Sequence, residues 1–161
     1  MADVILRPFD PSDAEWVIDR HRDLYARDEG FDATFGRVVA DAVTAFASDH
    51  DPARECGFIA LIEGIRVGSI FCTRSDAPDA ARLRLFLVLP EARRRGIGVQ
   101  LLQACIEFAR QVPVQKMQVS TYEEHRAACA LYAANGFQCT MRWPARAFGK
   151  DLVEQSWERV L

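Results

Sequence analysis

A strand, a turn and a helix follow one another directly in the middle of this chain. The run "ARLRLFLVLP" at 81–90 is rich in apolar, β-forming residues and is stopped by Pro90. The run "VQLLQACIEFARQ" at 99–111 repeats its apolar residues at helical spacing. Between them, "EARRRGIG" packs three arginines against two glycines. Any fold of this chain must therefore place a positive, glycine-containing turn between a strand end and a helix N-terminus.

The remaining pattern predicts one mixed α/β domain over residues 1–161. Asp10 or Ser12 is expected to cap the first helix, and Glu63-Gly64 to join two strands as a hairpin. Strands are predicted at 4–9, 56–64, 65–74, 81–90, 114–121, 137–143 and 151–161, with a loop at 144–150. Helices are predicted up to Gly30 and over 32–51, 99–111 and 122–137, the last closed by Asn135-Gly136.

The turn at 93–98 favours binding of a phosphorylated ligand. A helix N-terminus presents unpaired N–H groups and partial positive charge, and glycine lets a ligand approach the backbone. Arginine adds forked donors that suit phosphate. The alternative is a solvated loop with a tight turn. A dinucleotide fingerprint would need a third glycine where Leu101 stands, and no GK[ST] phosphate loop occurs, so hydride transfer and nucleotide hydrolysis are excluded.

Composition excludes several classes of function. The net charge of -3, without a basic tail, argues against nucleic acid or an anionic membrane as the main partner. No apolar run is long enough to span a bilayer, and the first residues do not read as a signal peptide. The three histidines lack HExxH-type spacing, so no metal site is expected. The five cysteines form no CxxC pair and are expected to be reduced thiols, which favours a cytoplasmic protein.

Three motifs in order resemble the GNAT superfamily of acyl-CoA-dependent N-acyltransferases. "RRRGIG" is similar to its pyrophosphate loop, "LRLFLVLPEA" to the strand before that loop, and "AACALYAANGF" to its helix-to-strand segment. The resemblance implies a mostly antiparallel mixed sheet that splays between its fourth and fifth strands, flanked by about four helices. It also implies acetyl-CoA as cosubstrate and an amine as acceptor.

A narrower resemblance concerns "HRDLYARDEGFDATF" and "FGKDLVEQSWERVL". These stretches look like the acetyltransferase half of bacterial proteins in which a MarR-type regulator is fused to a GNAT domain. With the first strand expected from about residue 4, a stand-alone chain that does not bind DNA is expected. The resemblance further implies a homodimer, for which the closing segment 155–161 is a candidate interface.

The resemblance assigns cofactor contacts residue by residue. The backbone at Leu87 and Val88 is expected to meet the thioester and pantetheine arm. Arg93, Arg94, Arg95, Gly96, Ile97, Gly98 and Val99 are expected to hold the pyrophosphate, the role that the residues suggest on their own. His125 stands where many members have a cofactor-contacting asparagine, so that contact is open.

Catalytic roles follow the same way. Tyr132 matches the general acid that protonates the departing thiolate, the alternative being ordinary helix packing. No glutamate is available on the fourth strand, where strict alternation would put Arg82, Arg84, Phe86 and Val88 on one face. Glu29 is therefore the preferred base, in a group with His21 and Asp28; a backbone-held water and a merely solvated acid are the alternatives.

The predicted reaction is direct transfer of an acetyl group from acetyl-CoA to an amine. A non-catalytic CoA-binding sensor or interaction module is the alternative. The acceptor stays open, because two cues conflict. Arg82 and Arg84 would attract an amine that carries a carboxylate, whereas Asp28, Glu29 and Asp32 would attract a polycation.

Overall fold

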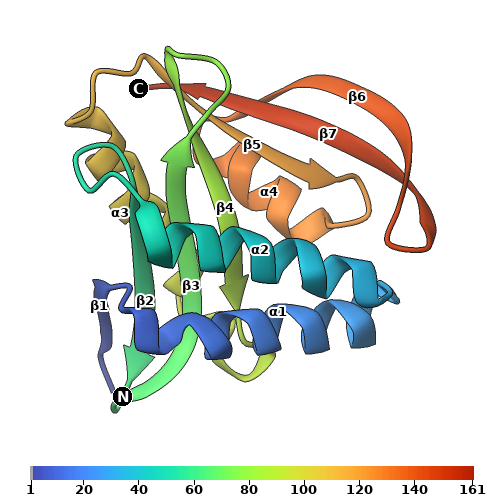
Figure 1. Ribbon diagram of the computed structural model, residues 1–161. Coiled ribbons are helices and arrows are strands. Elements are labelled where there is room, and N and C mark those ends of the chain that lie inside the picture. The colour runs from blue at the N-terminus through green and yellow to red at the C-terminus, as the bar shows by residue number, and fades with distance from the viewer. Residues whose placement is uncertain (1) are drawn as a thin grey trace.

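A computed structural model describes residues 2–161 and shows one seven-stranded sheet between two layers of helices (Figure 1). The sheet order is β1-β2-β3-β4-β5-β7-β6, and only the β4–β5 pair is parallel. The strands are β1 Val4–Pro8, β2 Cys56–Ile62, β3 Ile65–Arg74, β4 Ala80–Val88, β5 Lys116–Tyr122, β6 Gln138–Ala147 and β7 Lys150–Val160. The helices are α1 Ala14–Glu29, α2 Ala33–Asp49, α3 Ile97–Arg110 and α4 Arg126–Ala134, with 3₁₀ turns at Pro11–Asp13 and Pro90–Ala92. The predicted α/β architecture with four flanking helices is confirmed.

Each face of the sheet has its own apolar core. Helices α1 and α2 lie side by side over one face, where Val17, Val43 and Phe71 are fully buried. Helices α3 and α4 cover the other face, with Leu101 and Ile106 at the centre of the larger cluster. The β4–β5 parallel pair requires a crossover connection, which α3 supplies. The N-terminus of α3 is thereby brought to the end of β4.

Local backbone geometry explains where elements stop. Helix α1 ends at Gly30, which is left-handed at φ 69°, and α2 starts at Asp32, whose carboxylate accepts the Thr34 N–H at 3.0 Å. The predicted hairpin turn at Glu63-Gly64 is confirmed, with φ values of 51° and 77°.

Two predicted boundaries are wrong. The loop expected at 144–150 is a tight turn at Phe148 and Gly149, with φ values of 55° and 79°, so β6 and β7 run on to either side of it. The last helix begins at Arg126 rather than 122, because Tyr122 still belongs to β5.

The terminal strand is not an edge strand. Segment 155–161 lies in or just after β7, which pairs with β5 on one side and β6 on the other. The sheet edge at this end is β6, where Met141 is exposed. The homodimer stays a prediction, and the two edge strands of the sheet are β6 and β1. No helix within residues 2–161 has the length and apolar character that crossing a bilayer requires.

A buried carboxylate fixes α1 to the sheet. Asp13, directly before α1, is fully buried and accepts hydrogen bonds from Arg7 of β1 at 2.7 and 2.8 Å. It also accepts from Arg66 of β3 at 2.8 Å and from the Asp10 N–H at 2.8 Å. Burial alone would raise the pKa of Asp13, but these hydrogen bonds outweigh it and lower the pKa from 3.8 to about 2.

Asp13→Asn should lower the free energy of unfolding by about 2 to 4 kcal/mol near pH 7, because it leaves two guanidinium groups without their shared anion. The pKa of Asp13 is lower in the folded chain, so the ionised carboxylate stabilises the fold above about pH 4 and loses this effect as the pH falls towards 2. Urea unfolding of both proteins should therefore show a difference that shrinks in acid.

Asp19→Asn is the control, since Asp19 makes only an exposed pair with Arg22 at 3.2 Å and should cost less than about 1 kcal/mol. Equal losses for the two variants, or a difference that grows in acid, would contradict this account of Asp13.

Candidate functional site

The structure contains an open cleft of about 1050 Å³. Its walls come from α1 and α2 on one side, α3 and α4 on the other, and β4 and β5 between them. Nearly every residue that the sequence nominated lines it: Glu29, Leu87, Val88, Arg93, Arg94, Gly96, Ile97, Gly98, Val99 and Tyr132. Arg95 is the exception, and its side chain is exposed. The structure thus brings together groups from most of the length of the chain.

The cleft exists because β4 and β5 separate. Their pairing runs only from Ala80 with Lys116 to Leu83 with Val119. Strand β4 continues to Val88 and β5 to Tyr122 without further pairing between them. Beyond Leu83, the edge of β4 that faces β5 has no strand partner, and its backbone groups are available to a ligand. The splay that the family resemblance implied is present at this place.

A β-bulge at Leu85 turns the end of β4 over. Leu85 is left-handed at φ 54°, and the β3–β4 register slips between Ser69 and Phe71. Leu83 packs in the α3 core, but Leu85 packs against the α1–α2 core and Phe86 against the α3 core again. The Leu85 carbonyl accepts the Ser69 hydroxyl at 2.8 Å, which helps to hold the bulge.

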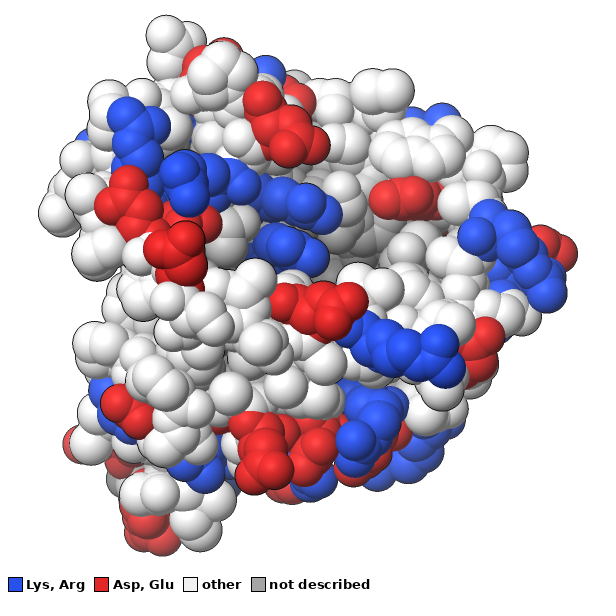
Figure 2. All heavy atoms as spheres, in the orientation of Figure 1, with Lys and Arg blue, Asp and Glu red and all other residues white. Residues whose placement is uncertain are grey.

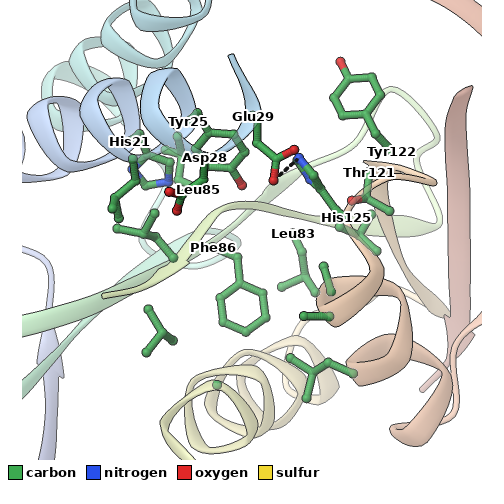
Figure 3. Close-up of a pocket in the computed structure, with 18 of the residues that line it drawn as sticks. His21, Tyr25, Asp28, Glu29, Leu83, Leu85, Phe86, Thr121, Tyr122 and His125 are labelled. Carbon is green, nitrogen blue, oxygen red and sulfur yellow. Dashed lines mark ion pairs between the residues drawn. The ribbon is translucent and has the colours of Figure 1, made fainter. Parts of the chain in front are cut away.

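The prediction that Arg82, Arg84, Phe86 and Val88 share one face is therefore wrong. The extra residue in the bulge reverses the alternation, so the two arginines lie on the α1–α2 side while Phe86 and Val88 lie on the α3 side. Figure 3 shows Leu85 and Phe86 on opposite sides of the strand. The strand can thus present different side chains to the two halves of the cleft.

A run of unpaired backbone donors lies at the N-terminus of α3. The N–H groups from Arg94 to Val99 have no acceptor anywhere in residues 2–161, and the first helical bond is donated by Gln100 to the Gly96 carbonyl at 3.0 Å. Such a run combines orphan donors with the positive end of the helix dipole. It suits an anion with several oxygens, such as a diphosphate.

Glycine at position 96 is required by the backbone and leaves space. Gly96 is left-handed at φ 73°, and a Cβ built on it would meet no atom within 4 Å. At Gly98, by contrast, a Cβ would be in ordinary contact with Leu131 and Phe86 at 3.5 and 3.7 Å. Open space over Gly96 is consistent with room for a ligand. Arg93 reaches back and donates from Nε to the Val88 carbonyl at 3.2 Å, tying the loop to the end of β4.

Tyr132 combines packing with access to the cleft. Its ring packs against Phe137 and Trp157, with centroids 5.5 and 6.3 Å away, and it is only 3% exposed. Burial raises the pKa of its phenol well above the ordinary value, so the hydroxyl is protonated at neutral pH. Packing and proton donation are therefore compatible roles for this residue.

Glu29 meets His125 across the cleft. The Oε1 atom of Glu29 lies 3.5 Å from Nε2 of His125, joining the end of α1 to the start of α4 (Figure 3). Burial lowers the pKa of His125, and the Glu29 charge only partly opposes this. The imidazole is thus neutral near pH 7, and Glu29 keeps an unneutralised carboxylate on the cleft wall.

The other two members of the predicted group are arranged differently. Asp28 is already paired with Arg27 at 2.9 Å. His21 is buried, and its Nδ1 atom donates to the Val17 carbonyl at 2.7 Å. Burial lowers the pKa of His21 to about 4, which makes it a poor base. Among residues 2–161, no three His, Cys, Asp or Glu side chains are grouped as metal ligands.

Sequence reasoning missed the aromatic wall around His125. Its ring lies 5.3 Å from that of Tyr25, 6.0 Å from Phe31 and 5.7 Å from Tyr122. Burial raises the pKa of Tyr25 to about 12. Within this wall, the Nε2 atom of His125 lies 3.5 Å from Glu29 Oε1. The sequence signal for this wall was the group of aromatic residues Tyr25, Phe31 and Phe35.

Comparison with known proteins agrees with this geometry. Residues 16–137 match the Acetyltransferase (GNAT) family. A curated protein from Xenopus tropicalis, "Probable N-acetyltransferase camello", is 36% identical over 84 residues, which are 52% of this chain and 38% of that protein. The match therefore spans about two fifths of that relative's length.

Solved structures share the whole fold. One is yncA, a putative acetyltransferase from Salmonella typhimurium with its cofactor acetyl-CoA, at a TM-score of 0.81 and 16% identity over 98% of this chain and 94% of that one. Another is Arabidopsis thaliana NAA60 in complex with a bisubstrate analogue, at a TM-score of 0.79 and 15% identity over 99% of both chains. At these identities the likeness concerns the fold.

Proposed function

Because the chain belongs to the acetyltransferase (GNAT) family, we propose that it is an N-acetyltransferase that moves an acetyl group from acetyl-CoA directly to an amine. The observation that carries the proposal is the run of unpaired N–H groups from Arg94 to Val99, set beside the gap between β4 and β5. This run would hold the diphosphate of CoA, with charge added by Arg93 and Arg94. The free edge of β4 at Leu87 and Val88 would carry the pantetheine arm and thioester.

Starting from the ammonium, the acceptor nitrogen loses two protons and the sulfur gains one. Glu29 takes a proton from the acceptor ammonium, and the free amine attacks the thioester carbonyl. Backbone N–H groups on the unpaired edge of β4 stabilise the negative charge that develops on the carbonyl oxygen. A C–N bond forms and the C–S bond breaks. Tyr132 donates its proton to the departing thiolate and takes up the second proton that leaves the nitrogen, while Glu29 passes the first to solvent.

Direct transfer is favoured over an acyl-cysteine intermediate. The Cys129 thiol, one turn before Tyr132, donates to Gln155 Oε1 at 3.3 Å and to the Tyr122 carbonyl at 3.7 Å. Burial raises its pKa, which disfavours the nucleophilic thiolate. The alternative of a CoA-binding module without catalysis rested on the missing acid of the fourth strand. The position of Glu29 on the cleft wall weakens that alternative.

The finer likeness to the acetyltransferase half of MarR-type fusion proteins stays a prediction from the sequence, as does a location in the bacterial cytoplasm. The stretch 21–35 that supports this likeness forms much of the cleft wall around Tyr25 and Glu29.

Gly96→Val should weaken CoA binding at least tenfold, because a Cβ at a left-handed position strains the turn at 93–98 and fills the space above it. The matched control is Gly64→Val. Gly64 is left-handed at φ 77°, also has open space around a built Cβ, and sits in the β2–β3 turn.

Both variants should lose about 1 to 2 kcal/mol of stability from backbone strain. Because the strain is similar in both variants, a difference in CoA affinity measured by titration calorimetry reports the effect of the turn at 93–98 alone. Equal CoA affinity in the two variants would show that Gly96 does not border the ligand.

Tyr132→Phe and Glu29→Gln should each lower kcat by roughly tenfold to a hundredfold or more, while CoA affinity stays near that of the parent. The Phe variant keeps the ring packing against Phe137 and removes only the hydroxyl. Asp28→Asn is the control for Glu29, since Asp28 is the adjacent acid and is paired with Arg27. Release of free thiol from acetyl-CoA with a competent amine is the measurement.

An unchanged kcat in Tyr132→Phe would reduce that residue to packing. Equal losses in Glu29→Gln and Asp28→Asn would mean that general negative charge, rather than Glu29 itself, assists the amine.

A further inference from the structure

Two arginines in the cleft have no acidic partner. Arg82 and Arg84 of β4 both line the cavity. Neither takes part in any ion pair or side-chain hydrogen bond among the described residues. By contrast, ion pairs hold many of the chain's other arginines: Arg7, Arg20, Arg22, Arg27, Arg66, Arg74, Arg142 and Arg146. Burial lowers the pKa of Arg84, and the charge of Arg82 lowers it further. Two like charges therefore sit close together in a partly dry wall with nothing to balance them.

Among the described residues, no acid forms an ion pair with either arginine. Glu158 lies opposite Gln118, the β5 neighbour of Arg82, but it pairs with Lys116 at 3.3 Å and accepts from Gln118 at 2.9 Å. At the other wall, Glu29 lies against His125. The arginine pair is thus a charged surface that the protein itself leaves uncompensated.

The pair faces the side of the sheet opposite to the N–H run of α3. Arg84 is in register with Phe71, which is buried under α1 and α2, whereas a Cβ on Gly98 would contact Phe86 and Leu131 on the α3 side. Figure 2 shows the α1–α2 face, where basic side chains border a hollow beside α2. A ligand held by the N–H run and a ligand held by the arginines would therefore approach the β4–β5 gap from opposite faces.

We propose that the acceptor amine carries an oxyanion group, a carboxylate or a phosphate, which Arg82 and Arg84 bind on the α1–α2 side of the cleft. This inference rests on the proposed acetyltransferase function. Guanidinium groups present forked donors that match either oxyanion, and charge-assisted bonds are strongest where water is partly excluded.

One acceptor can satisfy both of the charged groups that seemed to conflict in the sequence. The oxyanion lies on the arginine pair of β4, and the amine lies towards the Glu29 carboxylate at the end of α1. A polyamine would satisfy Glu29 but would place a second cation against Arg82 and Arg84. The arrangement therefore selects against polycations as well as for anionic amines.

The test uses acceptors that differ only in the anionic group. Amino acids, their carboxamides and their aminophosphonate analogues are offered as matched series, with free thiol as the readout. The acids or the phosphonates should exceed the carboxamides in kcat/KM by about tenfold to a hundredfold. Comparison of those two anionic series shows which oxyanion is preferred.

Substitutions at Arg82 and Arg84 test whether these two residues cause the preference for anionic acceptors. Arg82→Gln and Arg84→Gln should remove most of the preference by raising KM much more for the anionic acceptors than for the carboxamides, with CoA affinity close to that of the parent. Arg84→Lys should restore part of it, because it keeps the charge but not the fork. Arg110→Gln, at an exposed arginine at the end of α3, is the control and should change nothing.

Three outcomes are decisive. Carboxamides acetylated as well as the anionic amines would overturn the oxyanion proposal and leave the acetyltransferase function standing. A preference that survives in the Gln variants would overturn the assignment to Arg82 and Arg84. No turnover with any series, by a protein that binds CoA, would overturn the acetyltransferase function and this inference with it.

Discussion

The short pairing of β4 with β5 is the constraint on which the rest of the structure depends. The two strands are parallel and hydrogen-bond over only four residue pairs before they separate. A parallel pair needs a crossover, and here α3 makes it. Because α3 starts at the end of β4, its unpaired N–H groups open onto the gap that the separating strands create. The run of unpaired N–H groups and the exposed strand edge are therefore two results of one topological feature.

The attachment of α1 to the sheet determines where its charged side chains lie around the gap. Asp13 binds Arg7 of β1 and Arg66 of β3, so the start of α1 is fixed to one end of the sheet. Sixteen residues of helix then carry Glu29 to the gap, where it meets His125. Helix α1 thus places a carboxylate at the gap, whereas β4 carries none. The bulge at Leu85 completes the arrangement, since it turns Phe86 and Val88 to the α3 side and leaves Arg82 and Arg84 on the other.

Much of this could be predicted from the sequence because it depends on local chemistry. The strand–turn–helix unit, the hairpin at Glu63-Gly64 and the glycine-containing turn at Gly96 all follow from propensity, backbone freedom and helix-end geometry. The bulge could not be predicted, because alternation assumes a regular strand and a leucine gives no signal for a left-handed backbone. The pairing of Glu29 with His125 depends on tertiary contacts between distant segments. The turn at Phe148-Gly149 was hidden because Pro144, which suggested a loop, is tolerated in the edge strand β6.

A backbone amide NMR titration with CoA tests most directly whether the N–H run beside the gap is the cofactor site. The account predicts the largest shifts at the amides of 94–99, with smaller ones at Leu87 and Val88, and little change in the β2–β3 turn at Gly64. Saturable CoA binding that leaves the amides of 94–99 unmoved, or that perturbs only the α1–α2 face, would contradict it.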